Sequence, residues 1–306
     1  MLTNQITNHS YHLLRLLTAN GIGNSKSRQI MKACRDNDIP LDELFRSVEA
    51  NSLLPQFIMK YSEALRINET ELDQQWKSLL DKQVNSVSFD EKEYPERLLD
   101  ALGEKAPLVL FYKGNLDILN KPSAGFCGSR RPSIKGLETA RDCAGQLARE
   151  GVNIISGYAH GVDMAVHIAA LEAGGTTTII LAEGILNFKL KRDIQNVYDQ
   201  QRTLIISEFI PGLPWSVRNA MKRNSTLCGL SNLTILIEAQ EQGGSFNAGK
   251  ACLKMGRPLF APVYYGMPES AVGNRLLLEE GALSIMKSKT TGKAHMSKVV
   301  ELLFDK

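Results

Sequence analysis

The sequence lacks paired cysteines: its five cysteines are scattered over 306 residues, and no two form a C-x-x-C pair. An odd number of isolated cysteines excludes a disulfide framework and a zinc ribbon, and it indicates reduced thiols. No apolar run reaches the roughly 18 residues that a membrane-spanning helix needs. The first residues also lack the basic start and apolar stretch of a signal peptide. A cytoplasmic location without membrane association is therefore expected.

The chain also has little net charge, +3, and only 7% aromatic residues. The charge is unevenly distributed, however. Residues 121–260 carry 16 basic and 11 acidic side chains, whereas residues 1–120 carry 14 and 17. The middle of the chain is thus the candidate for an anionic partner. With 43% apolar residues, the composition is that of an ordinary globular protein. At about 150 residues per domain, the length predicts about two domains.

Residues 1–82 are predicted to form a small all-helical domain. Leu13, Leu17 and Ile30 recur at helical spacing on either side of a Gly21-Ile22-Gly23 turn. This turn fits two interpretations: a helix-hairpin-helix that offers backbone N–H groups to a phosphate, or a plain connection between two helices. The acidic surroundings favour the plain connection.

From residue 83 to 306 the pattern changes to short apolar strands that alternate with helices of 10–15 residues. This alternation predicts an α/β fold with a doubly wound, mostly parallel sheet. Strands are expected at 84–89, 108–112, 124–127, 152–156, 176–182, 203–207, 233–238 and 258–262. Helices are expected at 136–150, 162–173, 191–201, 217–228, 245–255 and 272–280.

Doubly wound sheets bind ligands at the carboxyl ends of their strands, so the residues that follow each predicted strand are the candidates. They combine glycine turns, which let a phosphate approach the backbone, with hydroxyl groups and basic side chains. The predicted phosphate-binding residues are Gly128, Ser129, Arg130, Gly157, His160, Lys189, Lys191, Arg192, Lys222, Arg223, Asn224, Gly244 and Ser245.

Several familiar sites are absent from the sequence. The loop at Gly128 lacks the G-x-G-x-x-G spacing of a dinucleotide site, and no P-loop is present. His160, Asp163 and His167 have the wrong spacing for a metal cage. Cys127 follows a strand, but such a cysteine is more often a small buried hydrophobe than a nucleophile. We therefore expect no catalytic residues, no metal and no cofactor.

The ordered set of loops resembles the DNA-processing protein A family (DprA, also called Smf). The resemblance covers roughly residues 84–285. Among the segments that carry it are 128–130 (GSR), 156–167 (SGYAHGVD…H), 223–231 (RN…GLS), 243–245 (GGS) and 256–257 (GR). The sequence departs from the family pattern where His160 and Ser225 replace arginines and where Ala220-Met221 replaces Phe-Pro. The winged helix that some members carry is not expected after Ile285.

This resemblance implies an extended Rossmann-like fold that binds single-stranded DNA, forms a homodimer and loads a RecA-type recombinase during natural transformation. Stacking surfaces for bases are few: Phe188, Tyr158 and Trp215 are the aromatic candidates. For Tyr158 and Trp215, core packing is the competing interpretation, and for Trp215 it is the stronger one.

Two other functions remain open. The fold could serve a sensor or enzyme for a nucleotide-derived small molecule, although no acidic residue closely follows Gly244 as glycosidic hydrolysis would require. A protein of the same family could also act in phage defence rather than in transformation.

Overall fold

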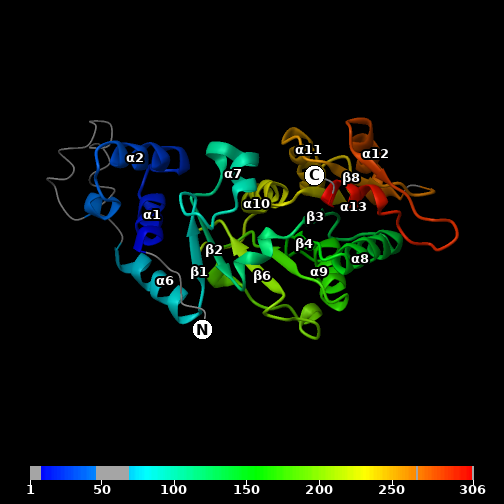
Figure 1. The fold of residues 1–306 in the computed structure, drawn as a ribbon, viewed down its shortest axis with the longest axis horizontal. Helices are drawn as coiled ribbons and strands as arrows, with labels where there is room; N and C mark the ends of the chain where they lie inside the picture. The colour runs from blue at the N-terminus through cyan, green and yellow to red at the C-terminus, as the bar shows by residue number, and fades with distance from the viewer. Residues whose placement is uncertain (1–7, 46–68, 267, 305–306) are drawn as a thin grey trace.

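The computed structural model describes residues 8–45, 69–266 and 268–304. A nine-stranded sheet runs through it in the order β1-β2-β6-β5-β4-β3-β7-β8-β9 (Figure 1). The strands from β3 to β9 pair in parallel, and β1 and β2 are added antiparallel at the β6 edge. The predicted α/β doubly wound, mostly parallel fold is thereby confirmed. The strands are β1 Asn85–Ser88, β2 Val109–Lys113, β3 Ser123–Cys127, β4 Asn153–Ser156, β5 Thr177–Ile180, β6 Thr203–Ser207, β7 Leu233–Leu236, β8 Leu259–Pro262 and β9 Leu283–Ile285.

Helices cover both faces of the sheet because successive side chains of a strand point to opposite faces. Ile154 of β4 packs with α8 (Ile134–Arg149), α9 (Val162–Glu172) and α13 (Ser297–Phe304). Its neighbour Ile155 packs into the opposite layer. That layer contains α7 (Glu96–Leu102), α10 (Val217–Leu230), α11 (Gly244–Lys254) and α12 (Val272–Glu279). Strands buried on both faces read as near-continuous apolar runs, which is why the sequence revealed them.

The N-terminal helices are α1 (Asn8–Thr18), α2 (Asn24–Asp36), the 3-10 turn η1 (Leu41–Phe45) and α6 (Glu69–Asp81). The turn at Gly21 joins α1 and α2 as predicted, with Gly21 at φ 77°. Leu13 and Ile30 share one apolar cluster with Ile179 and Ile205 of the sheet. The helical part therefore shares an apolar core with the sheet, and α1 packs on β1 and β2. Residues 46–68 of the predicted helical domain lie outside the described residues, and the division at 82/83 stays a prediction.

Four elements differ from the expectation. The short segments α7, β9 and α13 were not predicted, and the helix expected at 191–201 is wrong. That stretch contains one 3-10 turn, η5 (Arg192–Ile194), and otherwise turns and loops. Ile194 is the single fully buried residue between 191 and 200, so a longer helix would have no apolar stripe to bury. In the described part of the chain no helix is long and apolar enough to cross a membrane.

Arg28 of α2 joins the helical part to the β-sheet region. Its guanidinium donates to the carbonyl oxygens of Glu104 (3.1 Å) and Ala106 (2.8 Å) and lies 4.3 Å from the centre of the Phe89 ring. Hydrogen bonds from a charged donor to backbone carbonyls stabilise a fold more than exposed ion pairs do.

We expect Arg28→Ala to lower the free energy of unfolding by about 1–2 kcal/mol, because the side chain is half-buried and makes charged hydrogen bonds. Lys32→Ala, on an exposed position of the same helix, should change it by less than about 0.5 kcal/mol. Urea unfolding followed by circular dichroism measures both. Equal losses for the two variants would contradict the docking role of Arg28.

Candidate nucleic-acid interface

A crevice of about 610 Å³ opens at the carboxyl ends of β3 and β7. In the strand order β4 lies on one side of β3 and β7 on the other, so the winding of the chain reverses between β3 and β7. The helices that follow these two strands cover opposite faces of the sheet, and their loops therefore diverge and leave a hollow. The crevice is lined by residues 127–131, by residues 238–240, and by the first turns of α10 and α11.

The loop after β3 presents the arginines of the crevice. Arg130 and Arg131 are both exposed, and the loop is folded by a hydrogen bond from the Arg131 N–H to the Ser129 hydroxyl (3.0 Å). Gly128 packs against Val162 so closely that a Cβ would clash with it. The Arg130 guanidinium lies 5.6 Å from the ring centre of Trp215. Two cations thus stand at the mouth of the crevice.

The loop after β7 presents backbone amides. Gly243 has φ 118°, a conformation that favours glycine, and α11 begins at Gly244 without a side-chain cap. A Cβ at Gly244 would meet nothing within 4 Å, so the N-terminus of α11 faces open space. Ser245 donates to the Gly128 carbonyl (2.7 Å) and Asn224 to the Gly244 carbonyl (3.1 Å). These bonds tie the loop to β3 and α10 and leave the first amides of α11 for an anion.

Arg223 lines the same crevice from α10 and is almost fully buried. Its Nη1 lies 3.7 Å from Oδ2 of Asp163, whose carboxylate also accepts from the Ser156 hydroxyl (3.1 Å) and the Ala159 N–H (3.2 Å). At position 157 only glycine fits, because a Cβ there would overlap the guanidinium of Arg223. The Nε of Arg223 has no hydrogen-bond partner among the described residues. One buried N–H of this cation is therefore left without a partner in the described part of the protein.

The structure brings together seven of the predicted site residues in the crevice lining: Gly128, Ser129, Arg130, Arg223, Asn224, Gly244 and Ser245. Gly157 lies directly behind this lining, under Arg223. The other five lie outside it: His160, Lys189, Lys191, Arg192 and Lys222.

Lys222 lines a different groove, on another side of α10 from Arg223, and pairs with the buried carboxylate of Glu208 at 2.7 Å. Lys191 donates to the Tyr158 carbonyl oxygen and lies 4.5 Å from the Tyr158 ring centre, and burial lowers the pKa of this lysine. The exposed His160 stands 3.7 Å from Asp193. The expectation that Lys191 and Lys222 share the crevice with Arg130 is therefore wrong.

Among the exposed residues of the crevice lining that were not predicted are Arg131, Val217 and Met221. Trp215 was expected in the core, yet 47% of it is exposed at the crevice. Tyr158, by contrast, packs with Phe188 at 5.4 Å between ring centres and joins the core. One sequence signal could have predicted the exposure of Trp215. It stands between Pro214 and Ser216, the N-cap of α10, and so in a loop rather than within a buried element.

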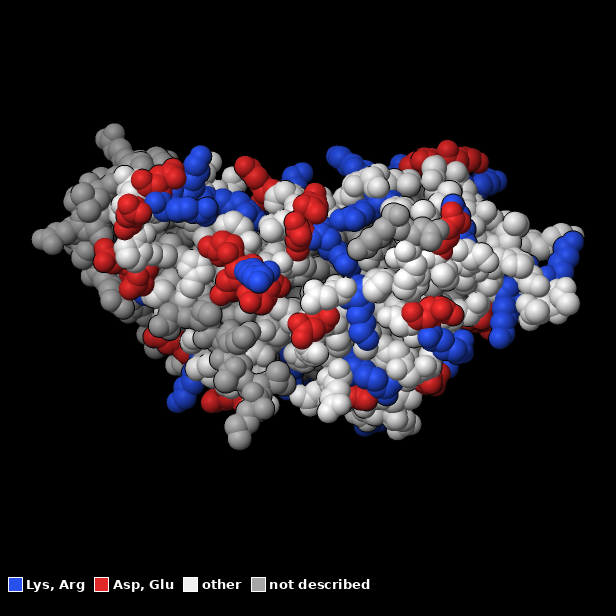
Figure 2. Space-filling view, viewed as in Figure 1, with Lys and Arg blue, Asp and Glu red and all other residues white. Residues whose placement is uncertain are grey.

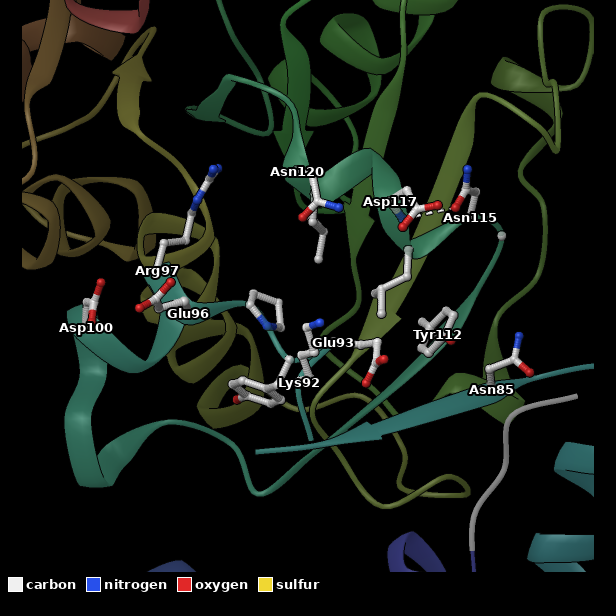
Figure 3. A pocket seen from close by; sticks show the side chains of 15 residues that line it. Asn85, Lys92, Glu93, Glu96, Arg97, Asp100, Tyr112, Asn115, Asp117 and Asn120 are labelled. Atoms are coloured by element: carbon white, nitrogen blue, oxygen red, sulfur yellow. Dashed lines mark hydrogen bonds between the residues drawn. The ribbon is translucent and has the colours of Figure 1, made fainter. Parts of the chain in front are cut away.

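A second hollow, of about 820 Å³, lies between residues 92–100 and 112–120 (Figure 3). Although larger, it is lined by four carboxylates, those of Glu93, Glu96, Asp100 and Asp117. Its Arg97 donates to Ser123 (2.6 Å) and Asn232 (3.0 Å) instead of facing a ligand. Because like charges repel a polyanion, we place the candidate interface at the crevice of β3 and β7.

The histidines, cysteines and acidic residues of the described part of the chain were candidates for a metal site in the sequence. No cluster of three histidine, cysteine or acidic side chains there could hold a metal ion. The cysteine at the crevice, Cys127, is buried, and burial raises the pKa of its thiol well above the ordinary value. The buried His167 donates from Nε2 to the Gly157 carbonyl (2.6 Å) and contacts the Thr177 hydroxyl (2.6 Å).

Known proteins are similar to this chain over most of its α/β part. A family model described as DNA recombination-mediator protein A matches residues 85–294. DNA processing protein DprA of Streptococcus pneumoniae is 35% identical over 179 residues, which are 58% of this chain and 63% of that protein. Protein Smf of Escherichia coli is 32% identical over 202 residues, 65% of this chain and 53% of its own. The chain thus matches less than two thirds of the length of these two relatives.

Two solved structures are similar. DNA processing protein A from Streptococcus pneumoniae superposes with a TM-score of 0.74 and 26% identity, covering 92% of this chain and 95% of that one. DNA processing protein A from Helicobacter pylori, a structure described for its single-stranded DNA binding mode, gives a TM-score of 0.56 and 26% identity, covering 66% and 90%.

His167 makes the loop behind the crevice sensitive to pH. Burial lowers its pKa to about 4, because a charged imidazole would lose its hydration there. In the unfolded chain the pKa is near 6.5, so the folded protein binds this proton less tightly. Stability from the neutral ring is fully present above pH 6.5 and is lost as the pH falls toward 4, by about 2–3 kcal/mol. Urea unfolding at pH 7 and pH 4 measures this loss.

His167→Gln is the matched control, since it keeps a donor for Gly157 and cannot titrate. The difference between wild type and variant isolates His167 from other groups, such as His9, whose pKa Asp90 raises through a hydrogen bond. Parallel losses in the two proteins, or an NMR titration of His167 near pH 6.5, would contradict the assignment.

Proposed function

Because the chain belongs to the DNA recombination-mediator protein A family, we propose that it binds single-stranded DNA in the crevice between β3 and β7 and catalyses no reaction on it. The observation that carries the proposal is the meeting of three kinds of phosphate donor at one place: the exposed guanidinium of Arg130, the open N-terminus of α11, and the unpartnered buried Nε of Arg223. Such donors bind phosphate regardless of base sequence.

The two carboxylates of the crevice lining do not oppose an anion directly, because each is engaged within the protein. Asp163 accepts from Ser156 and Ala159 and faces Arg223. Glu238 accepts from Ser133 and Ser270. The two exposed arginines of the β3 loop, on the other hand, form no ion pair among the described residues. The uncommitted charge at the mouth of the crevice is therefore positive.

Exposed apolar side chains supply a surface for bases. Trp215, Val217 and Met221 are between 47% and 64% exposed and border the crevice beside Arg130. Stacking on an aromatic ring contributes about 1–3 kcal/mol per base and tolerates any base. The bases of a single strand can reach Trp215, whereas those of a duplex are already stacked and paired. This supports a preference for single strands.

The finer expectations are part of the same proposal. A homodimer is supported by exposed apolar side chains in β9 and in the residues that follow β8 and β9: Val263, Tyr265, Leu283 and Met286. Delivery of the bound strand to a RecA-type recombinase during transformation is the last part of the proposal. The description of the family as a DNA recombination-mediator protein supports a role in recombination.

The protein should bind a labelled dT oligonucleotide more tightly than a duplex of equal length. Fluorescence anisotropy with each as the labelled probe, and with the other as competitor, measures this at one salt concentration. The preference follows from bases that must leave a stack to reach Trp215. Equal or tighter binding of the duplex would overturn the proposed function, and so would the absence of binding to either DNA.

Arg130→Ala and Trp215→Ala should weaken binding in different ways. Each should cost about 1–3 kcal/mol, because Arg130 supplies charged hydrogen bonds to phosphate and Trp215 supplies a stacking surface. In Arg130→Ala the slope of log K against log salt should fall in magnitude by about 0.7 for each phosphate that the arginine neutralises. In Trp215→Ala this slope should stay unchanged, since the indole carries no charge.

Lys26→Ala serves as the comparison, because Lys26 lies on the helical part and donates to the Gly21 carbonyl (2.7 Å). It should weaken binding much less than Arg130→Ala. The reverse order would assign the main contact to the α1–α2 hairpin instead of the crevice.

A further inference from the structure

The N-terminus of α8 is the place where a doubly wound fold ordinarily holds a nucleotide phosphate, because α8 follows the strand at which the winding reverses. In this protein a side chain of the chain itself lies there. Glu238 follows β7 at the same reversal point, belongs to the crevice lining, and is fully buried.

The carboxylate of Glu238 makes the contacts that a phosphate would make. Oε2 accepts from the Ser133 N–H (2.8 Å), and Oε1 accepts from the Ser133 hydroxyl (2.5 Å). The same hydroxyl accepts from the Gly136 N–H (3.0 Å), which links the first turn of α8 to the carboxylate. The Ser270 hydroxyl donates to Oε2 (2.8 Å). The negative charge is thus held by three donors and by the positive end of a 16-residue helix.

The sequence makes room for this carboxylate at Gly136. A Cβ at that position would overlap both carboxylate oxygens of Glu238. Gly145, in the same helix, has no such neighbour: a Cβ there would make an ordinary contact with Arg149 at 3.6 Å. The glycine at 136 is therefore required by the position of Glu238 and not by the backbone conformation.

The helices after β3, β4 and β7 differ in how their N-termini are occupied. At α8 the carboxylate of Glu238 is present, and at α9 the first turn contains Asp163, which accepts from the Ala159 N–H. At α11 the first turn has no acidic residue and no side-chain cap. Of these three positions, α11 is the one open to an external anion.

We propose that Glu238 is a built-in anion that replaces a nucleotide phosphate at α8, so that the crevice rejects mononucleotides and directs the phosphates of a strand to α11 and Arg223. A phosphate at α8 would have to displace a buried carboxylate or lie against a like charge, and both are costly. The direction of phosphates to α11 rests on the proposed single-strand function, whereas the rejection of mononucleotides does not.

The first experiment removes the internal anion with Glu238→Ala and offers a replacement. Sodium formate should raise the melting temperature of this variant with saturation, at constant ionic strength, whereas sodium chloride should not. Wild type should respond to neither salt. Glu238→Gln is the matched control: it keeps the volume, so it should be destabilised without rescue by formate. If Glu238→Ala does not fold in chloride, recovery of its circular dichroism in formate is the same test.

The second experiment measures dTMP binding by isothermal titration calorimetry. Glu238→Ala should bind dTMP at least about tenfold more tightly than wild type, because an open helix N-terminus with a hydroxyl donor binds phosphate. Gly136→Ala, which pushes on the carboxylate, should lower the melting temperature, and Gly145→Ala should not.

No preference for formate over chloride, or no gain in dTMP affinity, would overturn the role of Glu238. Affinity for a dT oligonucleotide is read separately in the same variants. If wild type does not bind the oligonucleotide, the proposed function fails while the formate and dTMP results still decide the role of Glu238. If Glu238→Ala loses oligonucleotide binding as completely as Arg130→Ala, the direction of phosphates to α11 is wrong.

Discussion

The ion pair between Asp163 and Arg223 joins the two helical layers of the protein across the carboxyl edge of the sheet. Asp163 comes from α9 on one face, Arg223 comes from α10 on the other, and each side chain is less than 10% exposed. Removing one partner of such a buried pair costs about 3–5 kcal/mol, since the other charge is left unpaired. The loop around Gly157 closes beneath the guanidinium, and His167 holds that loop by its carbonyl. The geometry of the crevice therefore depends on this pair, and Arg223 serves the fold as well as any ligand.

Much of the fold could be predicted because parallel strands buried on both faces leave runs of β-branched and apolar residues, such as Thr177–Ile180, between glycine turns. The elements that escaped prediction are short or atypical. Strand β9 has only three residues, two of them exposed, so the sequence shows no apolar run there. Helix α7 has only seven residues, and it begins directly after Pro95. The stretch after Lys191 was predicted as a helix from its place between two strands. Ile194 is the one buried side chain of this stretch, and a single buried residue provides too little apolar surface to stabilise a helix.

The sequence identified the loops of the candidate site, but it did not give the order of the strands, which decides which of these loops lie together. The loops after β3 and β7 supplied Gly128, Arg130 and Gly244, and these lie together because the two strands are neighbours. The loop after β5 is two strands away from β3, and its basic residues lie outside the lining of the hollow. Lys222 and Arg223 show a second limit. Successive residues of a helix point about 100° apart, and without the packing of α10 the sequence could not tell which of the two faces the crevice.

The net charge of the middle third says little about this interface, because many of its cations are engaged elsewhere. Arg141 pairs with Glu172, Arg202 with Asp199 and Lys250 with Glu280. On the face shown in Figure 2, basic and acidic side chains are interspersed without one large basic patch. The crevice is distinguished by its two acidic residues, Asp163 and Glu238, which are engaged by partners within the protein. The cations at the crevice are therefore not neutralised by these carboxylates. In a recess with reduced solvent screening, a few such charges act more strongly on a phosphate than a larger number spread over an exposed surface.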